Sequence, residues 1–346
     1  FNDLINYINT SKATEIILGI LLSVVIAFSI GAIVQWFSRV LLSYNFEKKA
    51  KWVGALFGGL ALTAINYFIL MKGLKVTSYA NKSITILVGV TIKDLLESQV
   101  LPIVIVSSVF WSLLSYTLIA FLKTNIYKLI IIVGTFALAL AFAGNDLVNF
   151  IGVPVAAYNA FVEWSASGLS AATFPMDVLA EKVTTNIWLL FAAGMIMVIT
   201  LWFSTKAKKV VKTSIDLSSQ GETKERFEPN FLSRGFVRMA MGMSQLTSYI
   251  LPNSWQTEID KQFEASEIKI SNKKAHELPA FDLVRAAVNL MVAAVLISIA
   301  TSYKLPLSTT YVTFMVAMGT SLADRAWGAE SAVYRVAGVI NVIGGW

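Results

Sequence analysis

The sequence predicts an all-α, polytopic membrane protein, and two observations carry this prediction. Hydrophobic residues make up 56% of the chain and charged residues 14%, with a mean hydropathy of +0.67. Soluble domains have about 45–50% apolar and about 25% charged residues. The apolar residues also lie in long runs that a soluble core does not need. The lipid bilayer is therefore an expected partner of this chain.

The apolar runs approach the roughly 20 residues that a helix needs to cross about 30 Å of hydrocarbon. Predicted membrane helices cover about 16–37, 52–71, 100–122, 126–161, 187–203 and 281–301. Pro306 opens a shorter apolar segment, which ends near Ala323 and which we expect to be re-entrant or half-spanning. A last apolar run begins near Ala332 and stops at Trp346, so we expect the chain to be a fragment cut at both ends.

The distribution of charge divides the chain into three parts. We expect a transmembrane bundle in 1–204, a polar loop in 205–278 and a transmembrane segment with the short apolar hairpin in 279–346. Two basic clusters mark cytoplasmic faces by the positive-inside tendency. These clusters contain Arg39, Lys48, Lys49 and Lys51, and then Lys206, Lys208, Lys209 and Lys212. Four predicted crossings separate the clusters, so the 205–278 loop is expected to be cytoplasmic and the 163–182 loop external.

Composition also excludes several classes of function. The net charge is +7, but Lys and Arg lie between apolar runs and form no single basic face, so we expect no nucleic acid partner. The chain has no cysteine and one histidine, His276, which excludes thiolate chemistry and a multi-histidine metal site. No nucleophile–base pair or phosphate-cradling glycine loop is evident. We therefore expect neither an enzyme nor a resident cofactor.

The segment Asn145-Asp-Leu-Val-Asn149 is predicted to lie in the middle of the membrane. A carboxylate there costs about 2.5–3.5 kcal/mol on insertion scales, so Asp146 requires compensation. Gly144 allows the backbone to leave helical geometry, and we expect one helix interrupted at its middle. Asn145, Asp146 and Asn149, with freed carbonyls, could hold a small hard cation such as Na⁺, with Asp146 as its charged metal ligand. The alternative is a polar contact that joins helices.

A second polar segment, Pro306-Leu-Ser-Thr-Thr-Tyr311, opens the short apolar piece. A proline at this point leaves backbone N–H groups unpaired over the next turn. Ser308, Thr309 and Thr310 add three hydroxyl donors, and such a helix N-terminus attracts oxyanions. Ordinary N-capping of a threonine-rich helix is the alternative. Asn145 and Asn149 are further candidates for binding the anion.

Asp282 and Arg285 lie three residues apart near the start of the 281–301 run. This spacing could give an interfacial ion pair or a gate, or an anchor at the membrane edge. Asp324 and Arg325 follow the short apolar piece, where we expect them to order the turn.

These two polar segments resemble the signatures of a known family. Ala143-Gly-Asn-Asp-Leu-Val-Asn149 is similar to the G-A-N-D-V-A-N motif of inorganic phosphate transporters, and Pro306-Leu-Ser-Thr-Thr-Tyr311 resembles their P-x-S-[ST]-T-H motif. The order of the motifs and the polar loop between them also match. Two departures are the Ala143-Gly144 order and Tyr311, which replaces the histidine of the family.

The resemblance implies an inverted-repeat transporter with broken helices and a re-entrant Ser-Thr hairpin. The second repeat would lie in this chain and the first upstream of Phe1. The implied function is transport of inorganic phosphate across the plasma membrane, the inner membrane of a bacterium, coupled to Na⁺ or H⁺ by alternating access. A homodimer is a candidate assembly. A permease for sulfate or another oxyanion, and a non-coupled channel or structural membrane subunit, remain alternatives.

Overall fold

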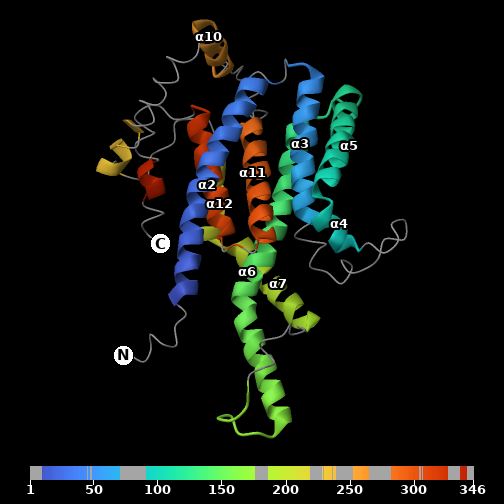
Figure 1. The fold of residues 1–346 in the computed structure, drawn as a ribbon, viewed down its shortest axis with the longest axis vertical. Coiled ribbons are helices and arrows are strands. Elements are labelled where there is room, and N and C mark those ends of the chain that lie inside the picture. Colours follow the sequence, from blue (N-terminus) through green and yellow to red (C-terminus); the bar gives the residue numbers. More distant parts are fainter. Residues whose placement is uncertain are drawn as a thin grey trace. The chain divides into compact units, whose positions relative to one another are not determined.

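The computed structural model describes most of the chain as helix. The described residues are 10–44, 46, 49–70, 91–175, 186–218, 228, 230–235, 237–238, 252–264, 282–303, 305, 307–325 and 336–340. No β-strand element occurs among them, so the all-α prediction is confirmed for this part of the chain. The helices are α2 (Thr10–Leu42), α3 (Lys51–Ile69), α4 (Ile92–Ser98), α5 (Val100–Ala120), α6 (Ile126–Ser167), α7 (Ile187–Phe203), α8 (Thr205–Ser218), α10 (Asn253–Gln262), α11 (Leu283–Ser302) and α12 (Thr309–Ala323) (Figure 1).

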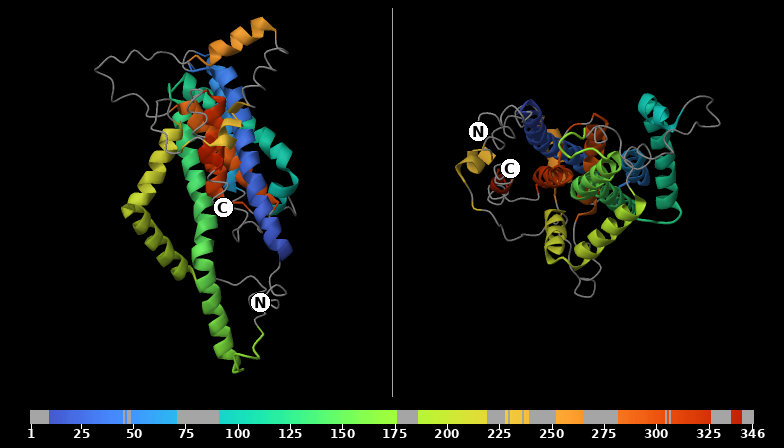
Figure 2. Two further views of the ribbon diagram at one scale, coloured as in Figure 1. Left: turned by 90° about the vertical axis from the view of Figure 1, so that its left-hand side faces the viewer. Right: turned by 90° about the horizontal axis from the view of Figure 1, so that it is seen from below.

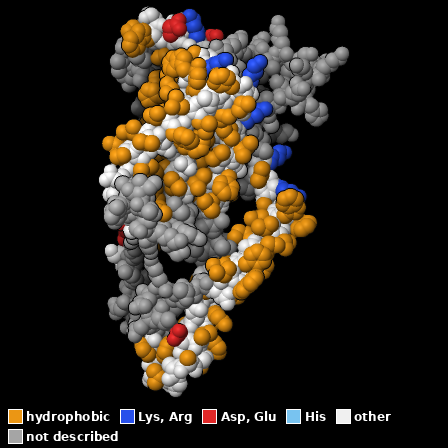
Figure 3. Space-filling view, turned by 90° about the vertical axis from the view of Figure 1, so that its right-hand side faces the viewer, with side chains coloured by type: hydrophobic (Ala, Val, Ile, Leu, Met, Phe, Trp, Pro, Cys, Tyr) orange, Lys and Arg blue, Asp and Glu red, His pale blue; other side chains and the backbone are white. Residues whose placement is uncertain are grey.

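Four helices are long and apolar enough to cross a membrane, within Ala13–Leu42, Lys51–Ile69, Val100–Ala120 and Leu283–Ala300. Their outward faces are apolar as well; Leu101 and Val106 on α5 are 71% and 70% exposed. Figure 3 shows one face of the molecule on which hydrophobic side chains cover much of the described surface. Exposed apolar surface of this extent is unfavourable in water and neutral in lipid. The helices are those of a membrane protein.

The chain divides into two compact units. Unit 1 comprises Phe1–Leu138 and Ser214–Trp346, and unit 2 comprises Ala139–Thr213. In unit 1, α2 packs along α12, α11 packs against α2, α3 and α12, and α3 packs along α5 (Figures 1 and 2). Unit 2 contains the second part of α6, α7 and most of α8.

Small residues allow the helices of unit 1 to approach closely. A Cβ added at Gly31 of α2 would lie 2.9 Å from the carbonyl oxygen of Val316 on α12, and one at Gly319 would overlap the carbonyl oxygen of Phe28. A Cβ at Gly59 of α3 would likewise overlap Ser112 of α5. Without a hydrophobic force between helices in lipid, close backbone contact of this kind holds a bundle together.

The polar ends of the unit 1 helices lie together at one end, which we call the charged end. There α2, α5 and α12 finish and α3, α6 and α11 begin, and α10 packs near the end of α2. Side-chain contacts join these segments, among them Arg39 with Asp324, Lys49 with Gln262, and Phe46 with Tyr127. The 252–264 part of the predicted polar loop therefore lies at the same end as Arg39, Lys49 and Lys51.

The predicted interruption of the helix around Asn145 and Asp146 is wrong for the backbone. Helix α6 is continuous from Ile126 to Ser167 and includes Gly144 and Pro154. A glycine costs only about 1 kcal/mol in a helix, and the alanine, leucine and phenylalanine before it are compatible with helix. Pro154 removes a single backbone hydrogen bond. At about 1.5 Å per residue, 42 residues give roughly 63 Å, about twice the hydrocarbon thickness.

The short apolar piece after Pro306 is a helix of 15 residues, α12, and ends at Ala323 as predicted. Its length is roughly 22 Å, less than the thickness of the hydrocarbon. It runs back along α11, because Asp324 at its end meets Arg285 near the start of α11. The re-entrant topology and the inverted repeat stay predictions. Pro306 itself lies outside the described residues.

Candidate functional site

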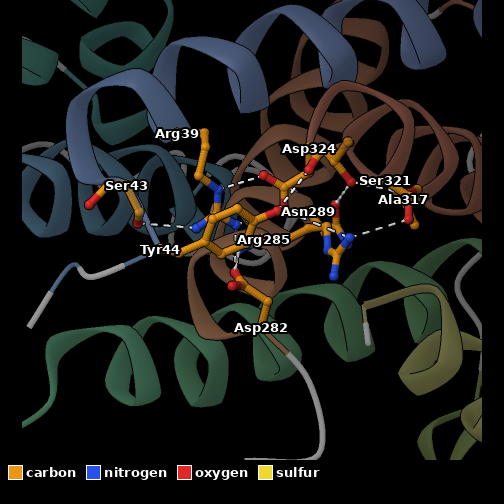
Figure 4. A network of polar contacts seen from close by, with 10 residues as sticks. Arg39, Ser43, Tyr44, Asp282, Arg285, Asn289, Ala317, Ser321 and Asp324 are labelled. Carbon is orange, nitrogen blue, oxygen red and sulfur yellow. Dashed lines mark hydrogen bonds and ion pairs between the residues drawn. The ribbon is translucent and has the colours of Figure 1, made fainter. Parts of the chain in front are cut away.

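Four ionisable side chains form a buried network at the charged end of unit 1. Arg39 comes from the last turn of α2, Asp282 and Arg285 from the start of α11, and Asp324 from the residue after α12 (Figure 4). The Arg39, Arg285 and Asp324 side chains are 0% exposed and that of Asp282 is 8% exposed. Helix α2 is thus joined through charge to α11 and α12, which are distant from it in sequence.

Arg39 is at the centre of the network. Its Nε and Nη2 donate to the two carboxylate oxygens of Asp324, with Nη2 to Oδ2 at 2.6 Å. Nη2 also lies 3.0 Å from Oδ1 of Asp282, and Nη1 donates to the carbonyl oxygen of Ser43 at 3.1 Å. A two-pronged arginine–carboxylate contact is the strongest common type of charged hydrogen bond in proteins.

Arg285 approaches the same carboxylate from α11. Its Nη1 lies 3.7 Å from Oδ2 of Asp324 and 3.4 Å from the hydroxyl oxygen of Ser321. Asp282 caps α11, because its Oδ1 accepts a hydrogen bond from the backbone N–H of Arg285 at 2.7 Å. The two residues that the sequence paired thus belong to one network, which also includes partners on α2 and α12.

Tyr44 covers the network where α2 ends. The Arg39 guanidinium lies 3.8 Å from the centre of the Tyr44 ring, and the Tyr44 hydroxyl donates to the backbone carbonyl of Asp324 at 2.7 Å. Burial, and then the nearby Asp324 carboxylate, raise the pKa of Tyr44, so the hydroxyl stays protonated and able to donate. Ser43 takes a left-handed backbone conformation, with φ 55°, which turns its carbonyl back toward Arg39.

The network balances its own charge, with two guanidinium and two carboxylate groups. Removing ions from water costs several kcal/mol each, and this cost is recovered only when geometry and hydrogen bonding are good. The contacts around Arg39 meet that condition. The arrangement suits a closure between helices, because charge-paired helix ends must separate before water or a solute passes between them.

A second polar layer lies about one turn deeper. Asn289, one turn after Arg285, accepts a hydrogen bond from the Thr320 hydroxyl of α12. Gln35, one turn before Arg39, is 0% exposed, and both polar atoms of its side chain lack a hydrogen-bond partner among the described residues. A buried amide of this kind costs about 1–3 kcal/mol unless water or another group satisfies it. Polar character therefore continues into the bundle from the charged end.

The hydroxyl residues of the second sequence motif lie at the opposite end of α12. Ser308 is the N-cap of α12, and its Oγ accepts from the N–H of Tyr311 at 3.5 Å. Thr309 is buried and Thr310 is exposed, while Thr313, one turn further on, donates back to the carbonyls of both. Ser308 thus takes the capping role that the sequence left open, and anion binding by these residues stays a prediction.

The residues of the first motif, which the sequence predicts to bind a cation, belong to unit 2. Asn145, Asp146 and Asn149 lie on the helical backbone of α6, with the two asparagines about one turn apart. Their side chains are outside the described part of the structure. Ser308, Thr309 and Thr310 belong to unit 1, so the two predicted half-sites fall in different units and their combination into one site stays a prediction.

Sequence reasoning missed two members of the buried network. Arg39 was interpreted as a cytoplasmic topology marker and Asp324 as a residue that orders a turn, whereas both are fully buried and bound to each other. One signal could have identified Arg39, because Gln35, Ser38, Arg39 and Ser43 follow helical spacing on an otherwise apolar helix. No local signal identifies its partner, which lies 285 residues away.

The comparisons with known proteins give no family for the chain. No protein-family model, no curated protein and no solved structure matches it significantly.

Proposed function

We propose that this chain is part of a secondary active transporter of inorganic phosphate, coupled to Na⁺ or H⁺, in the plasma membrane. The observation that carries the proposal is α12, a short and largely buried helix whose N-terminus bears Ser308, Thr309 and Thr310. Ser308 accepts a hydrogen bond from the N–H of Tyr311, and the remaining first N–H groups of α12, with the hydroxyls of Thr309 and Thr310, would suit an oxyanion. Half-spanning helices of this kind are a common substrate-site architecture in transporters.

The chemistry of this terminus favours a site that releases its anion again. No lysine or arginine occurs in 305–313, so the donors of the terminus itself are neutral, and Lys304 directly precedes this segment. Such donors bind less tightly than a fixed positive charge, and Asp146 is the residue that we propose to bind the coupled cation. Coupled binding of the two ions is the energetic basis of symport.

The buried network supplies a means of closing one side. Asp324 fixes the far end of α12 to Arg39 of α2 and Arg285 of α11, about four turns from Ser308. Alternating access requires that one side of the substrate site be closed while the other is open. We assign the charged end as the closed, cytoplasmic side in this conformation.

The test is uptake of labelled phosphate by the full-length protein in proteoliposomes, with an imposed Na⁺ or H⁺ gradient and without one. Thr309→Val keeps the shape of the side chain and removes its hydroxyl; we expect uptake to fall about tenfold, because one hydrogen bond to an anion is worth about 1.5–3 kcal/mol. Thr313→Val, one turn away, is the matched control, because its hydroxyl bonds only to α12 carbonyls among the described contacts. Equal losses in the two variants would count against an anion site at this terminus.

The role of Asp146 is tested in the same assay. Asp146→Asn should leave membrane insertion intact and strongly reduce the dependence of uptake on the cation, because it removes the charge of the predicted cation site. Unchanged cation dependence would remove Asp146 from the mechanism.

The remaining alternatives give different results in the same vesicles. A sulfate permease would take up labelled sulfate and show little competition by phosphate. A channel would equilibrate phosphate without accumulating it against its gradient. A structural subunit would transport neither anion.

A further inference from the structure

A second polar feature of the charged end lies away from the buried network. A cavity of about 310 Å³ opens between the start of α3, the end of α5 and the start of α6. Its floor is apolar, with Ile126 buried and the Phe46 and Tyr127 rings in contact at a centroid distance of 4.6 Å. Its rim is basic, and the lysines on it are Lys49, Lys51 and Lys123.

No acidic residue in the described part of the chain neutralises the positive charge of this rim. No aspartate or glutamate lines the cavity among the described residues. Lys49 donates to the neutral side chain of Gln262 at 3.0 Å, and Lys51 and Lys123 have no side-chain partner within the described part of the chain. Three lysines around one concave surface, with no acidic partner among the described residues, favour the binding of an anion.

The start of α3 adds backbone donors to the same cavity. Ala50 and Lys51 line it, and the N-cap residue Ala50 provides no side-chain acceptor for the first N–H groups of α3. The first turn of α3 contains no acidic residue either. In contrast, α6 is capped at the same cavity, because Asn125 accepts from the backbone N–H groups of Tyr127 and Lys128. The absence of a side-chain cap at Ala50 favours an anion at the start of α3, beside Lys51.

Lys123 occupies its position at a conformational cost. Its φ is 51°, in the left-handed region where glycine is favoured, and the next residue, Thr124, closes the turn by donating to the carbonyl of Leu118. This turn places the Lys123 side chain among the residues that line the cavity.

The cavity lies at the ends of candidate membrane spans. One apolar span begins at Lys51, another ends at Ala120, and the apolar part of α6 begins at Ile126. Large apolar side chains next to the rim face outward: Trp52 is 60%, Phe121 81% and Leu122 69% exposed. A basic pocket with lipid-facing apolar neighbours at this depth matches a phospholipid, with its phosphate on the lysines and its chains along the helices.

We propose that this cavity binds the phosphate headgroup of an anionic phospholipid of the leaflet at the charged end. The inference is independent of the transported substrate, since it uses neither α12 nor Asp146. Bound lipid would link α3, α5 and α6 at their shared end and would also approach α10 through the Lys49–Gln262 contact.

The test is native mass spectrometry of the purified full-length protein in detergent, titrated with phosphatidylglycerol or phosphatidylcholine. Phosphatidylglycerol should be retained preferentially, with one tightly bound copy per chain. Lys51→Gln combined with Lys123→Gly should weaken this copy about 25-fold, at roughly fivefold for each lysine removed near a membrane surface. Glycine fits the left-handed backbone at 123, so the double variant should keep its melting temperature.

Two controls separate a specific pocket from general attraction. Lys128→Gln combined with Lys261→Gln removes the same charge from exposed lysines that do not line the cavity, and should change the affinity less than twofold. Gly54→Leu keeps every lysine and fills the cavity, because even a Cβ at Gly54 would lie 3.6 Å from Ile119 and 3.7 Å from the Tyr127 hydroxyl. It should also remove the tightly bound lipid.

Three results would overturn the proposal. Equal retention of the two lipids would remove the preference for an anionic headgroup. An equal loss of lipid affinity in the two double variants would show that the overall charge of the protein, and not this cavity, holds the lipid. Displacement of the lipid by millimolar inorganic phosphate would show that the pocket takes soluble phosphate in place of a lipid headgroup.

Discussion

At the scale of single residues, Arg39 and Arg325 show how burial changes the contribution of an ion pair to stability. Both arginines lie at the charged end and both contact an aspartate, Asp324 and Asp260 respectively. The Arg39 pair is fully buried, whereas the Arg325 and Asp260 side chains are 55% and 60% exposed. Water screens an exposed pair, so its contribution to stability is about 0–1 kcal/mol.

We therefore predict that Arg39→Ala destabilises the protein by about 3–5 kcal/mol, because it leaves Asp324 and Asp282 buried without their main positive partner. Arg325→Ala is the matched control and should cost less than about 1 kcal/mol. The measurement is the apparent melting temperature of each purified variant in the same detergent. Similar shifts in the two variants would contradict the buried network.

A second variant separates the loss of an ion pair from the loss of a side chain. Arg39→Met combined with Asp324→Leu removes both charges and keeps similar volumes. Replacing both members of a buried pair is often close to neutral, although Asp282 and Arg285 would remain here as a pair on α11. We expect the double variant to be more stable than Arg39→Ala. A double variant less stable than the single one would mean that the guanidinium stabilises the helices through contacts other than charge.

At the scale of helices, the contact between α2 and α12 depends on the absence of side chains at Gly31 and Gly319. We predict that Gly319→Ala destabilises unit 1 by roughly 1–3 kcal/mol, because its Cβ would overlap the carbonyl oxygen of Phe28. Gly54→Ala is the control, since its Cβ would meet only ordinary contacts at 3.6 Å and 3.7 Å. Thermal unfolding in detergent compares the two. A Gly319 variant as stable as the Gly54 variant would show that α2 and α12 can move apart without cost.

The bounds of most of the apolar helices could be predicted from the sequence, because apolar residues are contiguous there. The 187–203 run coincides with α7, and the 52–71 and 100–122 runs differ from α3 and α5 by about two residues at most. The prediction failed at Gly144, where a residue that permits a break was taken to cause one. A glycine permits non-helical backbone conformations but does not require them. The neighbouring residues favour helix, so the helix continues through Gly144.

The candidate site was harder to predict than the helices. Asp282 and Arg285 were identified because they lie close together on an apolar helix. Their partners Arg39 and Asp324 are distant in sequence and sit next to helix ends, where charges are usually solvated. A single sequence does not show which helices contact one another. The pairing of Arg39 with Asp324 is therefore evident only from the fold.

At the scale of the whole molecule, the sidedness of the polar segments can be measured directly. The chain has no cysteine, so one introduced cysteine gives a single labelling position. We predict that Ser254→Cys, exposed on α10 at the charged end, is protected in intact cells from a membrane-impermeant maleimide and is labelled after permeabilisation. Ala171→Cys, exposed in the turn after α6, should be labelled from outside. Labelling of Ser254→Cys in intact cells would reverse the proposed orientation.

The distribution of the buried charges among helices determines how the molecule responds to voltage. Arg39 moves with α2 and Asp324 with α12, while Asp282 and Arg285 together give the start of α11 no net charge. A motion that carries the three helices as one body therefore transfers no charge through the transmembrane field. If α2 slides past α12 along the membrane normal, the Arg39 and Asp324 charges are displaced relative to each other. Moving one elementary charge across the whole membrane at 100 mV changes its energy by about 2.3 kcal/mol. Rearrangements that keep Arg39 on Asp324 therefore move no net charge of this network, whereas a displacement of one relative to the other along the membrane normal would contribute to a gating current.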